Sequence, residues 1–162
     1  PVRAQGERRW LGAAGFDSRG RLRALGELPI ESLQLDVWRA PTDNDLAAAV
    51  MDRWKSLLAH MQHRIESVEF TPDSLRTVTR SLAPGRDLGF TTTLHWTATD
   101  ALGVHCEVGI VPDAGWDIPL PRMGLALVVG TSLPQVRWEG RGPGGELPGH
   151  AAGRSRGCIR AQ

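Results

Sequence analysis

The sequence predicts a mainly β protein: an antiparallel β-sandwich with one short helix. Three observations lead to this prediction: stretches where apolar and polar residues alternate, turn sequences between them, and one segment with helical spacing. The 162 residues, 41% of them hydrophobic, fit one domain that buries a core. Because successive strands are joined by short turns, a meander of antiparallel strands is the natural architecture.

The first element expected is a hairpin over residues 8–28. At its centre, residues 17–20 read Asp-Ser-Arg-Gly, with Asp first and Gly fourth, which suits a type I turn. A second alternating stretch then begins, formed by Leu33, Leu35 and Val37. It leads to the sequence Trp-Arg-Ala-Pro-Thr-Asp-Asn-Asp at residues 38–45, named here the signature segment.

The one helix is expected over residues 46–60. Its apolar face consists of residues that recur at helical spacing: Leu46, Val50, Trp54, Leu57 and Leu58. Asp43, Asn44 or Asp45 is expected to cap it, because their side chains accept hydrogen bonds from the free N–H groups of the first turn.

The remaining chain is expected to form strands. Residues 65–70 and 75–82 flank a turn at 71–74, and a long hairpin turns at 100–103. Its two arms each place alternate residues on one face: Phe90, Thr92, Leu94, Trp96 and Ala98, then Val104, Cys106, Val108 and Ile110. The same alternation continues in Met123, Leu125, Leu127 and Val129. The whole of 1–162 is read as a single partial domain whose residues 140–162 form a poorly packed tail.

Composition argues against several classes of protein. A net charge of +1 provides no strong field for nucleic acid or a membrane. No apolar run reaches the roughly 18 residues that a membrane span needs. Two cysteines make no disulfide framework, so a reducing cytoplasm is the expected location. The chain begins with Pro rather than Met, which favours a fragment or processed piece.

The signature segment resembles the R-A-P-x-D-N-D run near the start of the last domain of family 2 β-galactosidases. Residues 15–22, 52–55 and 120–125 also resemble that domain, and 138–143 match its W-x-G-x-G-P pattern. The likeness thus covers essentially the whole chain. It departs where the family continues with Glu, Tyr and Asp, since Gly145, Leu147 and Gly149 stand there.

The resemblance implies a galactose-mutarotase-like supersandwich, of which this chain is about the first half. It implies part of a β-galactosidase that hydrolyses terminal β-D-galactosides in carbohydrate metabolism, with the catalytic glutamates on another domain. This chain would then shape the active-site wall and support the subunit, and would be inactive alone. It would hold no catalytic, cofactor-binding or metal-binding residue, because the Mg²⁺ and Na⁺ that family members often use lie on other domains.

The partners implied are a β-galactoside, bound through the intact enzyme, and the remaining domains or a large subunit. Two alternatives remain open. One is a non-catalytic carbohydrate-binding sandwich, and the other is an inactive truncated gene product.

Several residues invite a chemical interpretation with a structural one beside it. Asp43 and Asp45 form a carboxylate pair of the kind glycosidases need, but a turn and helix cap is the favoured interpretation. His60 and His63, three residues apart, have a spacing that can share a metal ion. Two ligands alone are a weak site, so contact of His60 with helix-end carbonyls is favoured.

Two further histidines lie on the predicted hairpin. His95 and His105 fall opposite its apolar faces, where they either lie on a solvated surface or line a groove, and the surface is favoured. His105 and Cys106 are adjacent in a strand, so they point to opposite faces and cannot act as a nucleophile pair. Cys106 is expected to be a buried thiol.

Aromatic and glycine-rich sequences have the same two interpretations. Four tryptophans are expected in the core, with stacking on sugar rings as the alternative: Trp38, Trp96, Trp116 and Trp138. Residues 140–145 are rich in glycine like a phosphate loop. They lack the Lys-Ser/Thr ending and a following helix, so a turn is expected.

Overall fold

The structure is a computed structural model that describes the chain as two compact units, Pro1–Gly130 and Thr131–Gln162. Backbone is described for residues 3–5, 8–40, 42, 43, 45, 60–99, 103–117, 119–130, 135–141 and 154–160. Side chains are described between residues 8 and 130 of these ranges. The predicted helix over 46–60 therefore lies outside the described residues, apart from His60, which lies in a turn.

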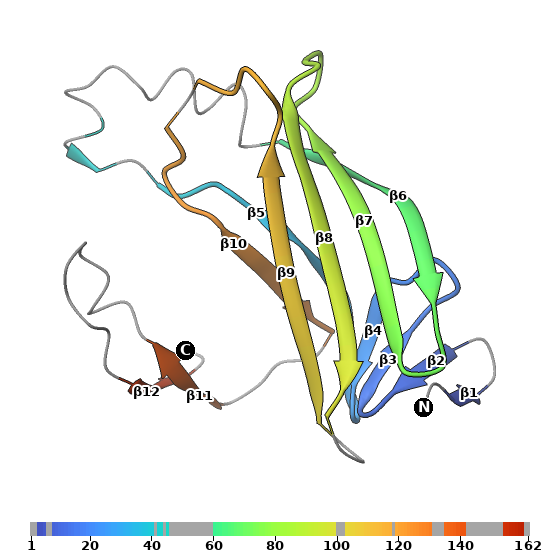
Figure 1. The fold of residues 1–162 in the computed structure, drawn as a ribbon. Helices are drawn as coiled ribbons and strands as arrows, with labels where there is room; N and C mark the ends of the chain where they lie inside the picture. The colour runs from blue at the N-terminus through green and yellow to red at the C-terminus, as the bar shows by residue number, and fades with distance from the viewer. Residues whose placement is uncertain are drawn as a thin grey trace. The chain divides into compact units, whose positions relative to one another are not determined.

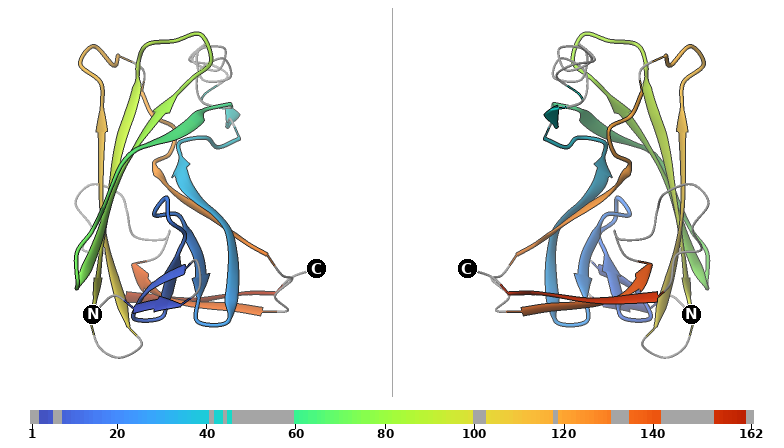
Figure 2. Two further views of the ribbon diagram at one scale, coloured as in Figure 1. Left: turned by 90° about the vertical axis from the view of Figure 1, so that its right-hand side faces the viewer. Right: turned by 90° about the vertical axis from the view of Figure 1, so that its left-hand side faces the viewer.

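The first unit contains two antiparallel sheets that face each other (Figures 1 and 2). One has the order β1-β2-β3-β4-β5-β10 and comprises Arg3–Gln5, Arg8–Leu11, Ala14–Phe16, Leu22–Leu25, Leu28–Asp36 and Gly124–Val129. The other has the order β6-β7-β8-β9 and comprises Gln62–Phe70, Ser74–Leu82, Gly89–Ala98 and Val104–Pro112. The predicted mainly β, antiparallel sandwich is confirmed.

The second unit contains β11 (Gln135–Arg141) paired antiparallel with β12 (Arg154–Arg160). Its side chains are not described, so the poor packing expected for residues 140–162 stays a prediction. Residues Gly145, Leu147 and Gly149, where the sequence departs from the family pattern, lie outside the described residues.

The core between the two sheets follows the predicted alternation. Phe16 of β3 meets Trp96 of β8 edge to face, with ring centroids 5.5 Å apart. Leu75 of β7 is completely buried beside them. A second cluster forms where Leu35 and Val37 cover Phe90. Trp96, Phe90, Leu35 and Val37 come from stretches that were predicted to alternate, so the period of two identified these core positions correctly.

The predicted hairpin over 8–28 is wrong in one respect: it contains two additional turns. The expected turn at 17–20 is present, closed by Gly20 N donating to Asp17 O at 2.9 Å. The chain also reverses at Gly12 and at Gly26, whose φ angles are +57° and +58°. Glycine adopts this left-handed backbone without the steric cost that other residues meet. Gly12 therefore divides the expected first arm into β2 and β3, and Gly26 separates β4 from β5 at the end of the second arm.

The apolar faces predicted for β9 and β10 are only partly buried. Val104 and Cys106 pack against the core, but Val108 is 40% exposed. On β10, Leu127 is 45% exposed, and the register with β5 shifts between Val128 and Val129. Within the described residues each of these strands borders its sheet, so alternation alone does not bury it.

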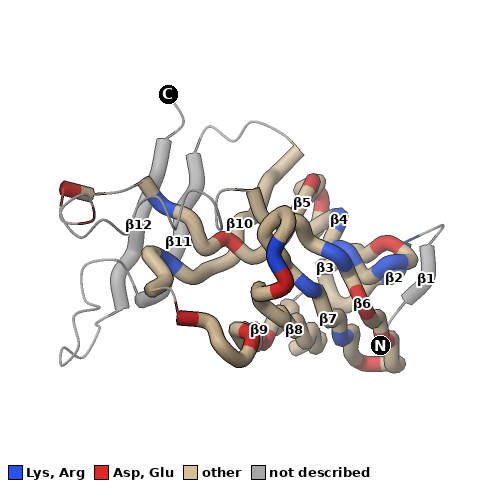
Figure 3. The backbone as a smooth tube through the Cα atoms, turned by 90° about the horizontal axis from the view of Figure 1, so that it is seen from above, with Lys and Arg blue, Asp and Glu red and all other residues tan. Residues whose placement is uncertain are grey.

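Charges of both signs are interspersed on the outer surface. β6 and β7 carry basic residues (Arg64, Arg76 and Arg80) and acidic residues (Glu66 and Glu69) close together (Figure 3). Among the residues that the structure describes, no helix has the length and apolar character of a membrane span.

Candidate functional site

The signature segment begins where β5 leaves its sheet. Trp38 N donates to Asp36 Oδ1 at 3.1 Å, which turns the chain directly after the strand. The Trp38 ring packs against the cluster formed by Leu35, Val37 and Phe90. The start of the segment is therefore anchored in the core.

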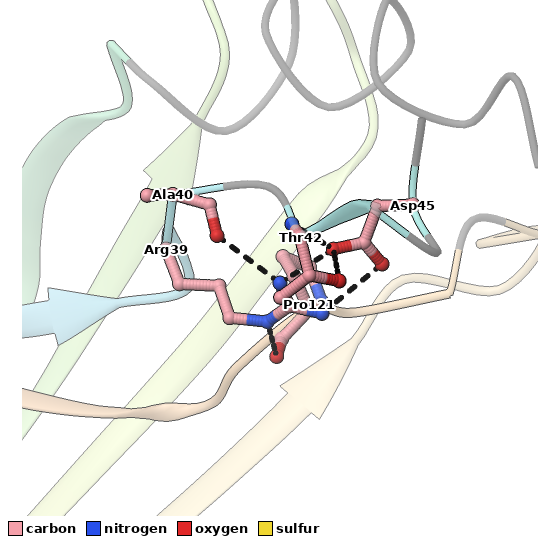
Figure 4. A network of polar contacts seen from close by, with 5 residues as sticks. All are labelled: Arg39, Ala40, Thr42, Asp45 and Pro121. Carbon is pink, nitrogen blue, oxygen red and sulfur yellow. Dashed lines mark hydrogen bonds and ion pairs between the residues drawn. The ribbon is translucent and has the colours of Figure 1, made fainter. Parts of the chain in front are cut away.

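Arg39 links this segment to a distant part of the chain (Figure 4). Its two terminal nitrogens donate to the two carboxylate oxygens of Asp45 at 2.6 and 3.1 Å. Its Nε donates to Pro121 O at 2.9 Å, across 82 positions of sequence. A two-pronged arginine–carboxylate pair is both stronger and more directional than a neutral hydrogen bond. One guanidinium therefore holds together the end of β5 and the segment that leads into β10.

Asp45 is saturated with hydrogen bonds. Besides Arg39, its Oδ2 accepts from Thr42 N at 2.7 Å and from Thr42 Oγ1 at 2.8 Å. The hydrogen bond from Arg39, followed by those from Thr42, holds the pKa of the Asp45 carboxyl well below its usual range. Asp45 therefore remains ionised near neutral pH, and a group with so low a pKa is a poor proton donor.

The cap of the expected helix differs from the prediction. Asp43 and Asp45 already have helical backbone, and the Asp45 side chain bonds back to the N–H of Thr42. This is the returning half of a capping box, with Thr42 in the cap position and Asp45 three residues later. The spacing Thr-x-x-Asp is a sequence signal for this arrangement. It makes Thr42 the cap residue, whereas Asp43, Asn44 or Asp45 was expected in that position.

The geometry favours the structural interpretation of Asp43 and Asp45 over a catalytic pair. Asp43 is exposed, whereas the Asp45 side chain is only 14% exposed and is bonded to Arg39 and Thr42. A nucleophile or acid needs a carboxylate that can reach substrate. Both oxygens of the Asp45 carboxylate already accept hydrogen bonds from Arg39 or Thr42.

A second ion pair, not expected from the sequence, joins β7 to the turn after β9. Arg80 Nη2 donates to Asp113 Oδ2, which also accepts from Gly89 N at 2.8 Å. Arg80, and then the N–H of Gly89, lower the pKa of the Asp113 carboxyl below its usual value. The three residues come from separate strands and turns, so no local pattern in the sequence connects them.

His60 and His63, whose spacing alone could share a metal ion, lie in different surroundings. His63 lies on β6, where its Nδ1 is 2.9 Å from Ser81 Oγ, and burial lowers its pKa. His60 is exposed in the turn before that strand. The described residues include no group of three or more His, Cys, Asp or Glu positioned to hold a metal ion.

On the long hairpin, the register places His95 opposite Glu107 and His105 opposite Thr97. The two histidines are therefore diagonal neighbours on the outer face, and His105 is exposed. Cys106 faces the core and is about half-buried, and this burial raises the pKa of its thiol to about 11. The prediction of opposite faces for His105 and Cys106 is confirmed.

Of the four tryptophans expected in the core, three have described side chains, and these three pack in the core clusters. Trp96 is 7% exposed, Trp116 lies with its ring 4.5 Å from that of Phe90, and Trp38 joins the same cluster. Trp138 lies on β11, where only backbone is described. The core interpretation is confirmed for Trp96, whereas the alternative for Trp138 stays open.

Fold and site together define a class: an antiparallel β-sandwich domain whose signature segment forms a hydrogen-bonded corner. This corner, named here the Arg39 corner, consists of Arg39 and its partners Asp45 and Pro121. The family model of the β-galactosidase small chain matches residues 15–154, and the chain belongs to this family. The β-galactosidase of Arthrobacter sp. (strain B7) is 30% identical over 161 aligned positions. The match covers 85% of this chain but 16% of that relative, so the chain spans about a sixth of its length.

Proposed function

We propose that this chain acts as part of a β-galactosidase that hydrolyses terminal β-D-galactosides. The observation that carries the proposal is the family match over residues 15–154, which includes the bonded signature segment. The β-galactosidase of Arthrobacter sp. (strain B7), to which the chain is 30% identical, supports it. The chemistry belongs to the assembled enzyme, in which this chain is one component.

The role of this chain in that enzyme is structural. A retaining glycosidase needs two carboxyl groups about 5–5.5 Å apart, one to attack and one to transfer a proton. The Asp45 carboxylate of the signature segment is already bonded to Arg39 and Thr42. We therefore assign the catalytic glutamates, and any Mg²⁺ or Na⁺, to other domains or to a large subunit. This chain would shape the wall of the active site and support the subunit.

The test is hydrolysis of a chromogenic β-galactoside by the purified chain, alone and mixed with a large subunit that carries the catalytic domain. Activity only in the mixture is expected. Activity of the chain alone would overturn the assignment of the catalytic groups elsewhere. No activity in either case, from a chain that melts cooperatively, would favour an inactive gene product or a binding module.

Arg39 allows a sharper version of this test. The variant Arg39→Gln removes both prongs of the bond to Asp45, so it should complement the large subunit less well than the parent chain. Arg76→Gln is the matched control, because Arg76 is exposed on β7 and loses the same charge. Equal complementation by both variants would show that the Arg39 corner does not matter to the assembled enzyme.

A further inference from the structure

The inner face of the second sheet is polar at its centre, which is unusual for a sandwich core. The strand register aligns Ile65, Thr79 and Thr92 in one row across β6, β7 and β8, with Thr77 in the next row. Thr77 and Thr92 are each 3% exposed. Buried hydroxyl groups normally have hydrogen-bond partners, because it costs free energy to remove a hydroxyl group from water without giving it a new partner.

A cavity of about 300 Å³ lies over this polar row, between the two sheets of the first unit. Its floor includes buried Thr77, Thr92 and Trp96, whereas Arg21 and Gln34 at its margin are exposed. This volume is at the lower end of the range for small-molecule sites, about 300–1000 Å³. The cavity therefore reaches from the surface to the polar centre of the sandwich.

The opposite wall has a local irregularity that helps to shape this space. The register between β5 and β10 skips Glu31, which makes it the extra residue of a β-bulge. Arg23, from β4, donates through Nη1 to Glu31 O at 3.1 Å and through Nε to Asp17 Oδ2 at 3.0 Å. Bulges redirect side chains and often occur beside functional sites. The wall at the bulge is thus held by hydrogen bonds of its own.

One atom in the cavity requires a partner. Thr92 Oγ1 is buried and has no hydrogen-bond partner among the described residues, although Thr92 lines the cavity. An unsatisfied buried hydroxyl costs more than a hydrogen bond gains, so a polar group inside the cavity would relieve this cost.

The charges around the cavity indicate which kind of ligand it suits. Arg21 and Arg23 are balanced by Glu31 and by Asp17, the ion-pair partner of Arg23. His63 also lines the cavity, and its burial lowers its pKa, which favours the uncharged imidazole. A site of zero net charge, with hydroxyl groups beside an aromatic ring, suits a neutral ligand that carries several hydroxyl groups.

We propose that this cavity binds a neutral polyhydroxylated molecule the size of a monosaccharide, with Thr92 Oγ1 hydrogen-bonded to one of its hydroxyl groups. The inference goes beyond the proposed function, because complementation of a large subunit does not require this site. The two proposals can also fail separately, because sugar binding to this cavity does not require the assembled enzyme.

The test is calorimetric titration of the full 162-residue chain with D-galactose, and separately with inorganic phosphate as an anionic probe. Galactose should bind in the millimolar range or tighter, and phosphate should not bind. Thr92→Val removes the buried hydroxyl with little change of shape, so galactose binding should weaken by about fivefold or more. Thr93→Val is the matched control, because Thr93 lies on the outer face of the same strand.

The melting temperature of Thr92→Val distinguishes the loss of a contact with the sugar from the loss of the fold. Because Thr92 Oγ1 has no partner, Thr92→Val should melt no lower than the parent chain. Three results would overturn the inference: no galactose binding by the folded chain, binding of phosphate instead, or equal binding by the two valine variants. The first of these would mean that the cavity holds only water.

Discussion

At the scale of single residues, the two aspartates of the signature segment differ in their importance for stability. Asp45 accepts from Arg39 and Thr42, whereas Asp43 is exposed. Asp45→Asn removes the charge that Arg39 binds, so it should lower the melting temperature clearly. Asp43→Asn loses the same charge without these bonds and should leave it unchanged. Thermal unfolding followed by circular dichroism compares them, and equal melting temperatures would contradict the corner described for Arg39.

The same bonds predict how stability depends on pH. Asp45 and Asp113 have folded-state pKa values below the ordinary 3.8, mainly because Arg39 and Arg80 donate hydrogen bonds to them. Each carboxylate therefore contributes stability that is fully present above about pH 4–5 and is lost as the pH falls toward the lowered pKa. The melting temperature should fall between pH 5 and pH 2.5. The double variant Asp45→Asn/Asp113→Asn should fall less steeply, and an unchanged slope would exclude these two groups as the cause.

Sequence reasoning located the signature segment but not its partners. The pattern identified Asp43 and Asp45 as turn or cap residues, and the Thr-x-x-Asp spacing also contained the role of Thr42. The bond from Arg39 to Pro121 spans 82 positions, and no local pattern carries information over that distance. The pair of Arg80 and Asp113 was missed for the same reason, since they meet only when β7 and the turn after β9 are placed together.

At the scale of elements, the glycine turns can be tested as a matched pair. Gly20 and Gly26 have φ angles of +72° and +58°, so alanine at either position costs about 1–2 kcal/mol for the left-handed backbone. At Gly20 an added methyl group would also meet Thr77 Cγ2 at 2.7 Å and Val68 Cγ1 at 2.9 Å. At Gly26 it would meet nothing within 4 Å.

Gly20→Ala should therefore destabilise the chain more than Gly26→Ala, measured as the free energy of unfolding in urea. The extra cost arises because the turn before β4 touches β6 and β7 of the facing sheet. Equal losses would mean that backbone strain alone matters and that the two sheets yield easily at this contact.

These turns also show where element prediction stopped. Alternation located most of the long strands, because each inward face repeats every two residues. The extra turns at Gly12 and Gly26 depend on single glycines, which occur inside strands as well as between them. The partial exposure of β9 and β10 depends on which strands lie beside them, and this is a property of the folded sheet.

At the scale of the whole molecule, the borders of the sheets determine how the isolated chain should behave. Among the described residues, β9 pairs with β8 and with no strand on its other side, and Val111 is 62% exposed there. An edge with apolar side chains and free backbone groups is a template for pairing with another chain. The isolated chain should therefore self-associate as its concentration rises, measured by light scattering after size-exclusion chromatography.

A lysine on that edge should suppress the association, because a charge on an edge strand opposes pairing. Val111→Lys tests this on β9, and Thr93→Lys adds the same charge to β8, which has a partner on both sides. If only Val111→Lys restores the monomer, the edge of β9 is the contact. If both variants restore it equally, the cause is the added net charge, and the edge loses its special role. If neither does, self-association must arise at another surface, and the exposed Leu127 and Val128 of β10 become the next positions to substitute.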